Sequence, residues 1–178
     1  MENELNPFLS LRAERKPKAE KKPYIKPDAV KLLENRLHEA RLKKYAHLDI
    51  PPSYIVKVKR RDDTANGLTQ CVIDWIVLDG GQAERINTTG KPLIQHDSRG
   101  QARGVKWITG NTTRGSADIS ATIKGKSVKV EVKIGKDRQS EAQKAYQEAI
   151  EAAGGLYFIA HSFPQFLEWY ERQFPPTS

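Results

Sequence analysis

The segment Gly115 to Lys133, GSADISATIKGKSVKVEVK, constrains the fold more strongly than any other part of the chain. Small or apolar residues alternate with polar ones on both sides of Lys124-Gly125. Alternation with a period of two around a two-residue loop is typical of a β-hairpin. The sequence therefore predicts two antiparallel strands with one apolar face and one polar face.

The register of this hairpin follows from pairing apolar residues with apolar ones, because opposite residues share a face of the sheet. A loop at Lys124-Gly125 leaves Lys126 at the turn end of the apolar face, opposite Ile123. The other apolar pairs are Ala121 with Val128, Ile119 with Val130, and Ala117 with Val132. The polar pairs are Thr122 with Ser127, Ser120 with Lys129, and Asp118 with Glu131. A shift of one residue would place Asp118 opposite a valine, so we exclude it.

Asp118, Glu131 and Lys133 gather on the predicted polar face. Two facing carboxylates have Cβ atoms roughly 5 Å apart, so both can reach one divalent ion. A metal ion there would polarise a phosphate and lower the pKa of a bound water, and the lysine would stabilise negative charge. This pattern suits phosphodiester hydrolysis. The alternative is an exposed strand face, on which cross-strand ion pairs contribute little stability.

The rest of the chain predicts further helices and strands around the hairpin. Asp28 is the expected N-cap of the first helix, and Gly80-Gly81 and Gly154-Gly155 are expected to end two later helices. The expected order is a helix over 28–46, a short strand within 50–63, a helix from 64 to 79, a strand over 82–87, a polar loop over 88–104, a strand over 105–110, the hairpin, a helix over 137–153, a strand over 156–160 and a helix over 164–174. Helices and strands in this order predict an α/β fold with a central mixed sheet.

The charge distribution divides the chain into three parts. The net charge is +8, and residues 1–62 hold 16 basic and 9 acidic residues. We expect a disordered basic arm over 1–27, a helix, short strand and linker over 28–62, and the main domain over 63–178. Arg85 to Gly115 adds six basic residues against one acid. This balance favours a polyanionic partner, nucleic acid first, and the arm is expected to clamp phosphates without sequence preference.

Cysteine content and hydropathy limit the expected location. Cys71 is the single cysteine, which excludes an intramolecular disulfide framework and a zinc site built from several thiolates. No run of apolar residues approaches bilayer length. We therefore expect a cytoplasmic protein without a membrane partner.

Five short motifs occur in order along the chain: GGQAERIN, GSAD, EVK, SEAQ and AAGGLYFIA. In this order they resemble the VRR-NUC (virus-type replication-repair nuclease) branch of the PD-(D/E)XK nuclease superfamily. The resemblance covers about residues 64–170 and implies a restriction-endonuclease-like core of helix, three strands, helix and strand, here behind a basic N-terminal extension. It implies a metal-dependent DNA endonuclease, with a phage or mobile-element origin.

The resemblance also assigns roles to residues. Asp118 and Glu131 would bind Mg²⁺, with Mn²⁺ as a substitute, and Lys133 would position the attacking water. Gln143 would lie beside the scissile phosphate, although Ser140 and Gln143 also fit a capping box. Nucleic-acid contacts are expected from Arg85, Asn87, Arg99, Arg103, Arg114 and Ser140. For Arg85 and Asn87, simple pairing at a strand end is the alternative.

One departure from the superfamily pattern concerns the first helix of the domain, which often carries a further acid. Its start here, NGLTQ, has no carboxylate. Three alternatives follow. Asp74 or Glu84 takes the place of the missing acid, the metal site works without that acid, or the metal site is weakened. The last option favours a different function, namely a nucleic-acid-binding protein that keeps the fold but does not cleave.

The aromatic and histidine residues give weaker signals. Trp75, Trp107 and Trp169 lie in apolar patterns and are expected in the core. The four histidines share no spacing, so they are expected to be surface or structural residues, with His96 an outside candidate for a DNA contact. Cys71 is expected to be inert on the packing side of its helix.

Overall fold

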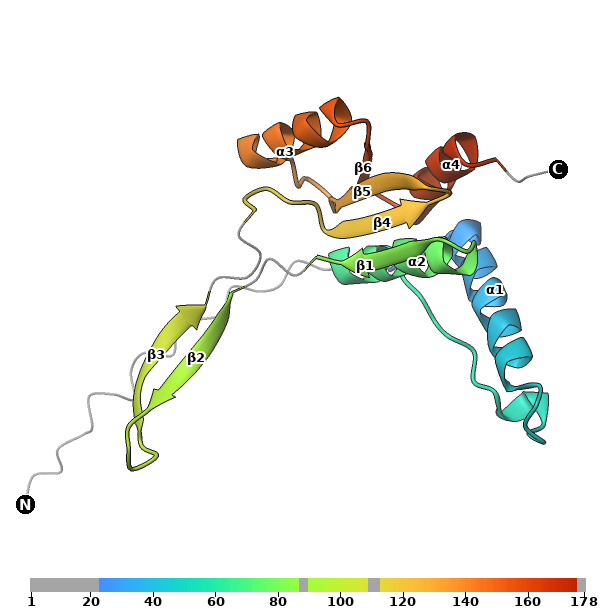
Figure 1. Cartoon of the computed structure of the whole chain (residues 1–178). Helices are drawn as coiled ribbons and strands as arrows, with labels where there is room; N and C mark the ends of the chain where they lie inside the picture. Colours follow the sequence, from blue (N-terminus) through green and yellow to red (C-terminus); the bar gives the residue numbers. More distant parts are fainter. Residues whose placement is uncertain (1–22, 87–89, 109–112, 176–178) are drawn as a thin grey trace, which may run out of the picture.

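The computed structural model describes residues 23–86, 90–108 and 113–175, which form a mixed α/β fold (Figure 1). Its elements are α1 (Asp28–Tyr45), a 3₁₀ helix (Pro52–Tyr54), α2 (Ala65–Leu78), β1 (Gln82–Arg85), β2 (Lys91–His96), β3 (Ala102–Ile108), β4 (Ile119–Ile123), β5 (Lys126–Val132), α3 (Glu141–Ala152), β6 (Leu156–Ala160) and α4 (Phe163–Gln173). None of these helices is both long and apolar enough to cross a membrane.

The central sheet has the strand order β1-β4-β5-β6 and is mixed, as predicted. β1, β4 and β5 are antiparallel neighbours, whereas β6 runs parallel to β5. The predicted hairpin register is confirmed from the Ile123–Lys126 pair to the Ile119–Val130 pair. Lys124 (φ 46°) and Gly125 (φ 78°) both have left-handed backbone, the conformation that a two-residue type I′ loop requires.

The apolar face of the hairpin is buried, as the alternation predicted: it packs against α2, while α1 and α4 complete the core around α2. Ile119, Ile123, Val128 and Val130 are buried there, and the α4 aromatic rings surround Trp75. The segment 28–62 contributes Val30 and Leu33 to the same core. Figure 1 shows α3 on the opposite side of the sheet from α2. The polar face therefore lies between the sheet and α3.

The predicted basic arm is described only from residue 23 onward, and residues 1–22 lie outside the described residues. The Tyr24 hydroxyl donates to Asp62 Oδ1 at 2.8 Å. The other carboxylate oxygen of Asp62 accepts from the Phe163 backbone N–H at 3.0 Å. Lys26 pairs with Glu34 at 2.6 Å. Residues 23–27 are therefore tied to the fold, at the end of the segment that was expected to be a disordered arm.

Two predictions about the N-terminal part are wrong. Asp28 is the first helical residue, not the N-cap, and its carboxylate binds Lys31 at 2.8 Å. Residues 50–63 form a 3₁₀ turn and extended chain instead of a strand. Arg60 explains this, because its backbone N–H donates to Glu34 and its side chain to Asp74. These bonds take the place of a strand partner.

The predicted polar loop over 88–104 is also wrong, because β2 and β3 form a second hairpin that projects from the central sheet (Figure 1). Asp97 makes its turn: Oδ1 accepts from the backbone N–H groups of Arg99 at 2.8 Å and Gln101 at 3.0 Å. In such an Asx turn the aspartate side chain accepts from nearby backbone N–H groups, which stabilises a turn at this position. Trp107 lies on this hairpin with 64% of its surface exposed, so its predicted place in the core is wrong.

Candidate active site

Glu131 and Lys133 lie at the carboxyl end of β5, on the polar face of the sheet. Both are buried, with 2% and 6% of their surface exposed. Glu131 Oε1 is 3.1 Å from Lys133 Nζ. The backbone N–H of Lys133 donates to the Ala160 carbonyl at 2.9 Å, which extends the β5–β6 pairing past the end of β5. A buried ion pair is therefore held on rigid sheet backbone.

Gln143 joins this pair to the start of α3. Its Nε2 donates to Glu131 Oε1, and its Oε1 accepts from Lys133 Nζ at 3.1 Å. The same Oε1 accepts from the Ser140 backbone N–H at 2.9 Å, and Ser140 Oγ accepts from the Gln143 N–H at 3.3 Å. The capping-box prediction is confirmed. One amide thus caps the helix and fixes both charged side chains, whereas its place beside a phosphate stays a prediction.

Asp118 lies immediately before β4 and is half-buried. Its Oδ2 accepts from the Val132 backbone N–H at 2.9 Å, and its carbonyl accepts from the Ile86 N–H at 2.8 Å. The predicted register would place Ala117 opposite Val132, so that the Val132 N–H would bond to the backbone of the neighbouring strand. The Asp118 side chain accepts from this N–H in its place. The carboxylate is consequently fixed beside Glu131 at the end of the hairpin.

Gly115 explains how the loop before Asp118 reaches α3. A Cβ added at Gly115 would lie 2.2 Å from the Ala142 carbonyl oxygen and 2.7 Å from the Gln143 nitrogen. The φ angle of Gly115 is +77°, which glycine adopts readily. Only glycine allows the loop to lie against the first turn of α3 at this position. The first residue of the GSAD motif therefore sets the approach of Asp118 to Gln143.

The two carboxylates of Asp118 and Glu131 favour a cation between them. Burial raises the pKa of the Glu131 carboxyl, and the neighbouring Asp118 raises it further, while Lys133 and Tyr157 act in the opposite direction. Like charges in a poorly solvated site disfavour ionisation unless a cation lies between them. The pKa of the Tyr157 hydroxyl is also raised, first by burial and then by the charge of Glu131. That tyrosine stays a hydrogen-bond donor at neutral pH.

The donor set fits Mg²⁺. Two carboxylates are the hard oxygen ligands that this ion takes, with water filling the remaining positions. Within the described ranges, no three His, Cys, Asp or Glu side chains converge on one point, so Asp118 and Glu131 would act as a pair. Burial is the first cause of the raised pKa of Glu131 and the charge of Asp118 the second, and a divalent cation between the two carboxylates would relieve that second contribution.

The two substitutes considered for the missing helix acid lie in different places. Asp74 is bound to Arg60 at 2.5 Å and to Gln70 at 2.8 Å, on the helix that covers the apolar face. Glu84 pairs with Ser120 across β1 and β4, one row from Asp118 on the polar face. Asp74 therefore lies outside the carboxylate site, and Glu84 is on the correct face.

The predicted nucleic-acid contacts that the structure describes are spread over four places. Arg85 ends β1 opposite Ile119, which the register assigns to the apolar face, so it does not join Glu131 there. Arg99 and Arg103 are exposed on the β2–β3 hairpin, and Arg114 is exposed next to Gly115. Ser140 is the N-cap of α3. Asn87 lies outside the described residues.

Sequence reasoning missed two residues that contact this cluster. The Tyr157 hydroxyl donates to Glu131 Oε2 at 3.5 Å, and the Asp137 carboxylate is 3.6 Å from Lys133 Nζ. The alternation in LYFIA could have indicated Tyr157, since Phe158 and Ala160 point to the core and Tyr157 to the other face. Nothing in the sequence indicates Asp137, because its contact depends on the turn after β5.

A scan against protein-family models and a search of curated proteins both returned no match to this chain.

Proposed function

We propose that this chain is a Mg²⁺-dependent nuclease that hydrolyses phosphodiester bonds in nucleic acid, with DNA as the expected substrate. One observation carries the proposal: a buried Glu131–Lys133 pair, locked by Gln143, lies beside Asp118 at the end of the hairpin. With β2 and β3 inserted after β1, the order α2, β1, β4–β5 hairpin, α3, β6 resembles the order expected of a restriction-endonuclease-like core, which supports the proposed membership of the VRR-NUC branch. A cytoplasmic location and a phage or mobile-element origin would follow from that membership.

In this proposal, Asp118 and Glu131 hold Mg²⁺, which supplies Lewis acidity at the phosphate when bound. Lys133 Nζ is fixed by Glu131 and Gln143, each at 3.1 Å, which leaves one of its three N–H groups to donate to the attacking water with little loss of freedom. The Gln143 amide orients both side chains and lies at the N-terminus of α3, which favours a phosphate. Tyr157 donates to Glu131 Oε2 at 3.5 Å, which favours the ionised form of the carboxylate.

Nucleic acid as the partner is supported by the positions of basic side chains. Arg99, Arg103 and Lys106 are exposed on the β2–β3 hairpin, where Asp97 is occupied by turn hydrogen bonds. A two-stranded ribbon of this kind fits a nucleic-acid groove. Arg114 extends the basic surface to Gly115, at the entrance to the carboxylate pair.

The second candidate is a nucleic-acid-binding protein that keeps the fold without cleaving. A specific observation favours it: Glu131 Oε1 already accepts from Gln143 and contacts Lys133. Those bonds satisfy the carboxylate without a metal ion, as a purely structural cluster would require.

A cleavage assay on duplex, single-stranded and branched DNA, with RNA as a further substrate, tests the proposal. The wild type is expected to cleave with Mg²⁺ and not with EDTA, and Glu131→Gln is expected to lose this cleavage. Glu141→Gln is the matched control, because Glu141 is exposed on α3 and its carboxylate pairs with Lys144 at 2.8 Å. A wild type that binds these substrates but cleaves none of them supports the second candidate.

A further inference from the structure

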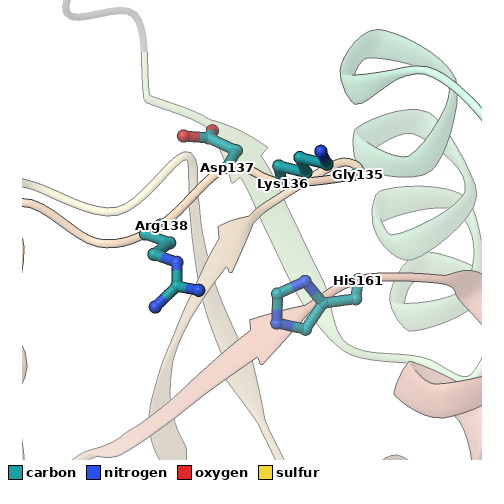
Figure 2. Close-up of a pocket in the computed structure, with 5 residues that line it drawn as sticks. All are labelled: Gly135, Lys136, Asp137, Arg138 and His161. Carbon is teal, nitrogen blue, oxygen red and sulfur yellow. The ribbon is translucent and has the colours of Figure 1, made fainter.

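An open hollow of about 710 Å³ lies next to the candidate active site, lined by Gly135, Lys136, Asp137, Arg138 and His161 (Figure 2). The parallel pair β5–β6 creates it. Both strands end at the same edge of the sheet, and the chain then diverges into the 135–138 turn on one side and His161 on the other. Crevices outside the carboxyl ends of parallel strands are common ligand sites.

The lining of this hollow is basic. Lys136 and Arg138 face one acid, Asp137, whose carboxylate is 3.6 Å from Lys133 Nζ and so is paired with the active-site lysine. Figure 2 shows the Arg138 guanidinium and the His161 imidazole directed toward one another, with Asp137 and Lys136 farther along the turn. Two side chains that donate hydrogen bonds therefore converge from different segments, which suits an anion.

The backbone at His161 is fixed before any ligand arrives. Its N–H donates to Gln165 Oε1 at 3.0 Å, and the next residue, Ser162, caps α4 by accepting from the Gln165 N–H. α4 has 11 residues, so its positive end adds to the basic side chains at this edge. The imidazole is thus presented beside a helix N-terminus.

We propose that this hollow binds a phosphate group of the nucleic-acid strand whose scissile bond lies over Asp118 and Glu131. The proposal rests on the proposed function and deepens it by naming a second phosphate subsite. Asp137 places the two sites side by side, since it both lines the hollow and contacts Lys133. Arg138 and His161 donate to the phosphate, and Lys136 contributes charge at the rim. The phosphate comes from a 5′ end or from an internal linkage of the strand.

Binding in the Glu131→Gln background without metal tests the subsite separately from cleavage. Fluorescence anisotropy is measured for one oligonucleotide with a 5′-hydroxyl, a 5′-phosphate, or neutral methylphosphonate linkages at single internal positions. Arg138→Ala and His161→Ala are each expected to weaken binding about three- to tenfold. Arg172→Ala, an exposed cation in the last turn of α4, is the matched control and is expected to change it less than twofold.

The probes distinguish the two sources of phosphate. Sensitivity to Arg138→Ala only with the 5′-phosphate assigns the subsite to a strand end. If Arg138→Ala also weakens binding of the 5′-hydroxyl strand, and this effect disappears when one internal linkage is neutral, the subsite binds that internal phosphate. Affinities equal to that of the Arg172→Ala control with every probe would overturn the subsite, as would a His161 imidazole NMR signal that does not move when the oligonucleotide is added.

The outcomes also separate the subsite from the nuclease activity. If the wild type never cleaves while Arg138→Ala weakens binding, the subsite stands and the proposed catalysis fails. If the wild type cleaves and the Arg138 and His161 variants bind and cleave like the control, the nuclease stands and the subsite fails. Circular dichroism and thermal melting of each variant establish that the comparison is between folded proteins.

Discussion

Gly115 lies so close to Ala142 that a Cβ at position 115 would stand 2.2 Å from the Ala142 carbonyl oxygen. Gly115→Ala must therefore push the loop before Asp118 away from α3. We expect a loss of about 1–3 kcal/mol in the free energy of unfolding from overpacking, together with a strong loss of cleavage. Chemical denaturation and the cleavage rate measure the two effects.

Gly154→Ala is the control for this prediction. Gly154 has a similar φ of +81°, but nothing lies within 4 Å of a Cβ added there. It therefore reports the cost of left-handed backbone alone, about 1 kcal/mol, and should leave cleavage unchanged. If Gly115→Ala is no more destabilising than Gly154→Ala and cleaves normally, the loop does not need this approach to α3.

Glu131→Gln should make the protein more stable near neutral pH while removing cleavage. Burial and Asp118 raise the folded-state pKa of Glu131 above the 4.5 of an ordinary carboxyl. The unfolded chain loses this proton at lower pH than the folded one, so stability falls as pH rises from about 4.5 to the folded pKa. Glutamine removes that cost, and Lys133 keeps Gln143 and Asp137 as partners.

Thermal melting of the wild type and Glu131→Gln from pH 4 to pH 8 tests whether the stability of the wild type falls as the pH rises. The variant should melt a few degrees higher at pH 7.5, and the difference should vanish near pH 4. Isothermal titration with Mn²⁺ provides the second readout, because the variant should lose the metal affinity of the wild type. Equal Mn²⁺ affinities would show that Glu131 is not a ligand.

The hairpin register could be predicted from residues 115–133 because strand alternation and a Lys-Gly loop leave one solution that keeps Asp118 from facing a valine. The contact of Gly115 with Ala142 could not, since it joins segments whose relative position depends on the whole sheet. Asp137 was missed for the same reason, because it reaches Lys133 through the turn after β5. Tyr157 differs, because the alternation in LYFIA could have placed it on the polar face, although not against Glu131 in particular.

Trp107 shows a second limit of the sequence. Its apolar neighbours predicted a buried strand, yet β2 and β3 pair only with each other in the described part of the chain, and side chains on both faces are exposed there. Hydrophobic alternation indicates a strand but not what covers it. The buried face of β4 and β5 was predictable because helices with matching apolar stripes lie on either side of it along the chain.

The basic hairpin should supply part of the electrostatic affinity for nucleic acid. Arg99→Ala combined with Arg103→Ala should weaken binding and lower the slope of log K against log salt by up to about 1.8, since each lost phosphate contact removes about 0.9. Binding curves at several salt concentrations measure the slope. Lys124→Ala combined with Lys126→Ala, at the far turn of the β4–β5 hairpin, is a charge-matched control and should leave it unchanged.

Removal of residues 1–22 should also reduce the salt dependence of binding, while cleavage at low salt survives. The deletion is placed there because Tyr24 and Lys26 are anchored to Asp62 and Glu34, so a longer deletion would disturb the fold. An unchanged slope after the deletion would assign the electrostatic contacts to residues 85–115 instead.

Lys133 separates the nuclease from the non-cleaving protein. If its ammonium acts on the attacking water in the transition state, Lys133→Ala should lower the cleavage rate by orders of magnitude with little loss of substrate affinity. In a binding protein, the same change should weaken binding slightly and remove no activity. Because Lys133→Ala leaves Glu131 buried without its cation, its melting temperature must be measured beside its rate.

Lys133→Arg is the sharper variant, because it keeps the charge but replaces a compact ammonium with a planar guanidinium. Lys133 is 6% exposed and fixed by Glu131 and Gln143, so the larger group cannot take the same position. We expect a folded protein that binds substrate and cleaves at least a hundredfold more slowly, on the order of one lost general-catalytic group. Lys129→Arg, two rows away on the same face with its Nζ bound to Ser120, is the control and should cleave like the wild type. A Lys133→Arg variant with wild-type cleavage would remove Lys133 from the catalytic residues and leave it as a structural partner of Glu131.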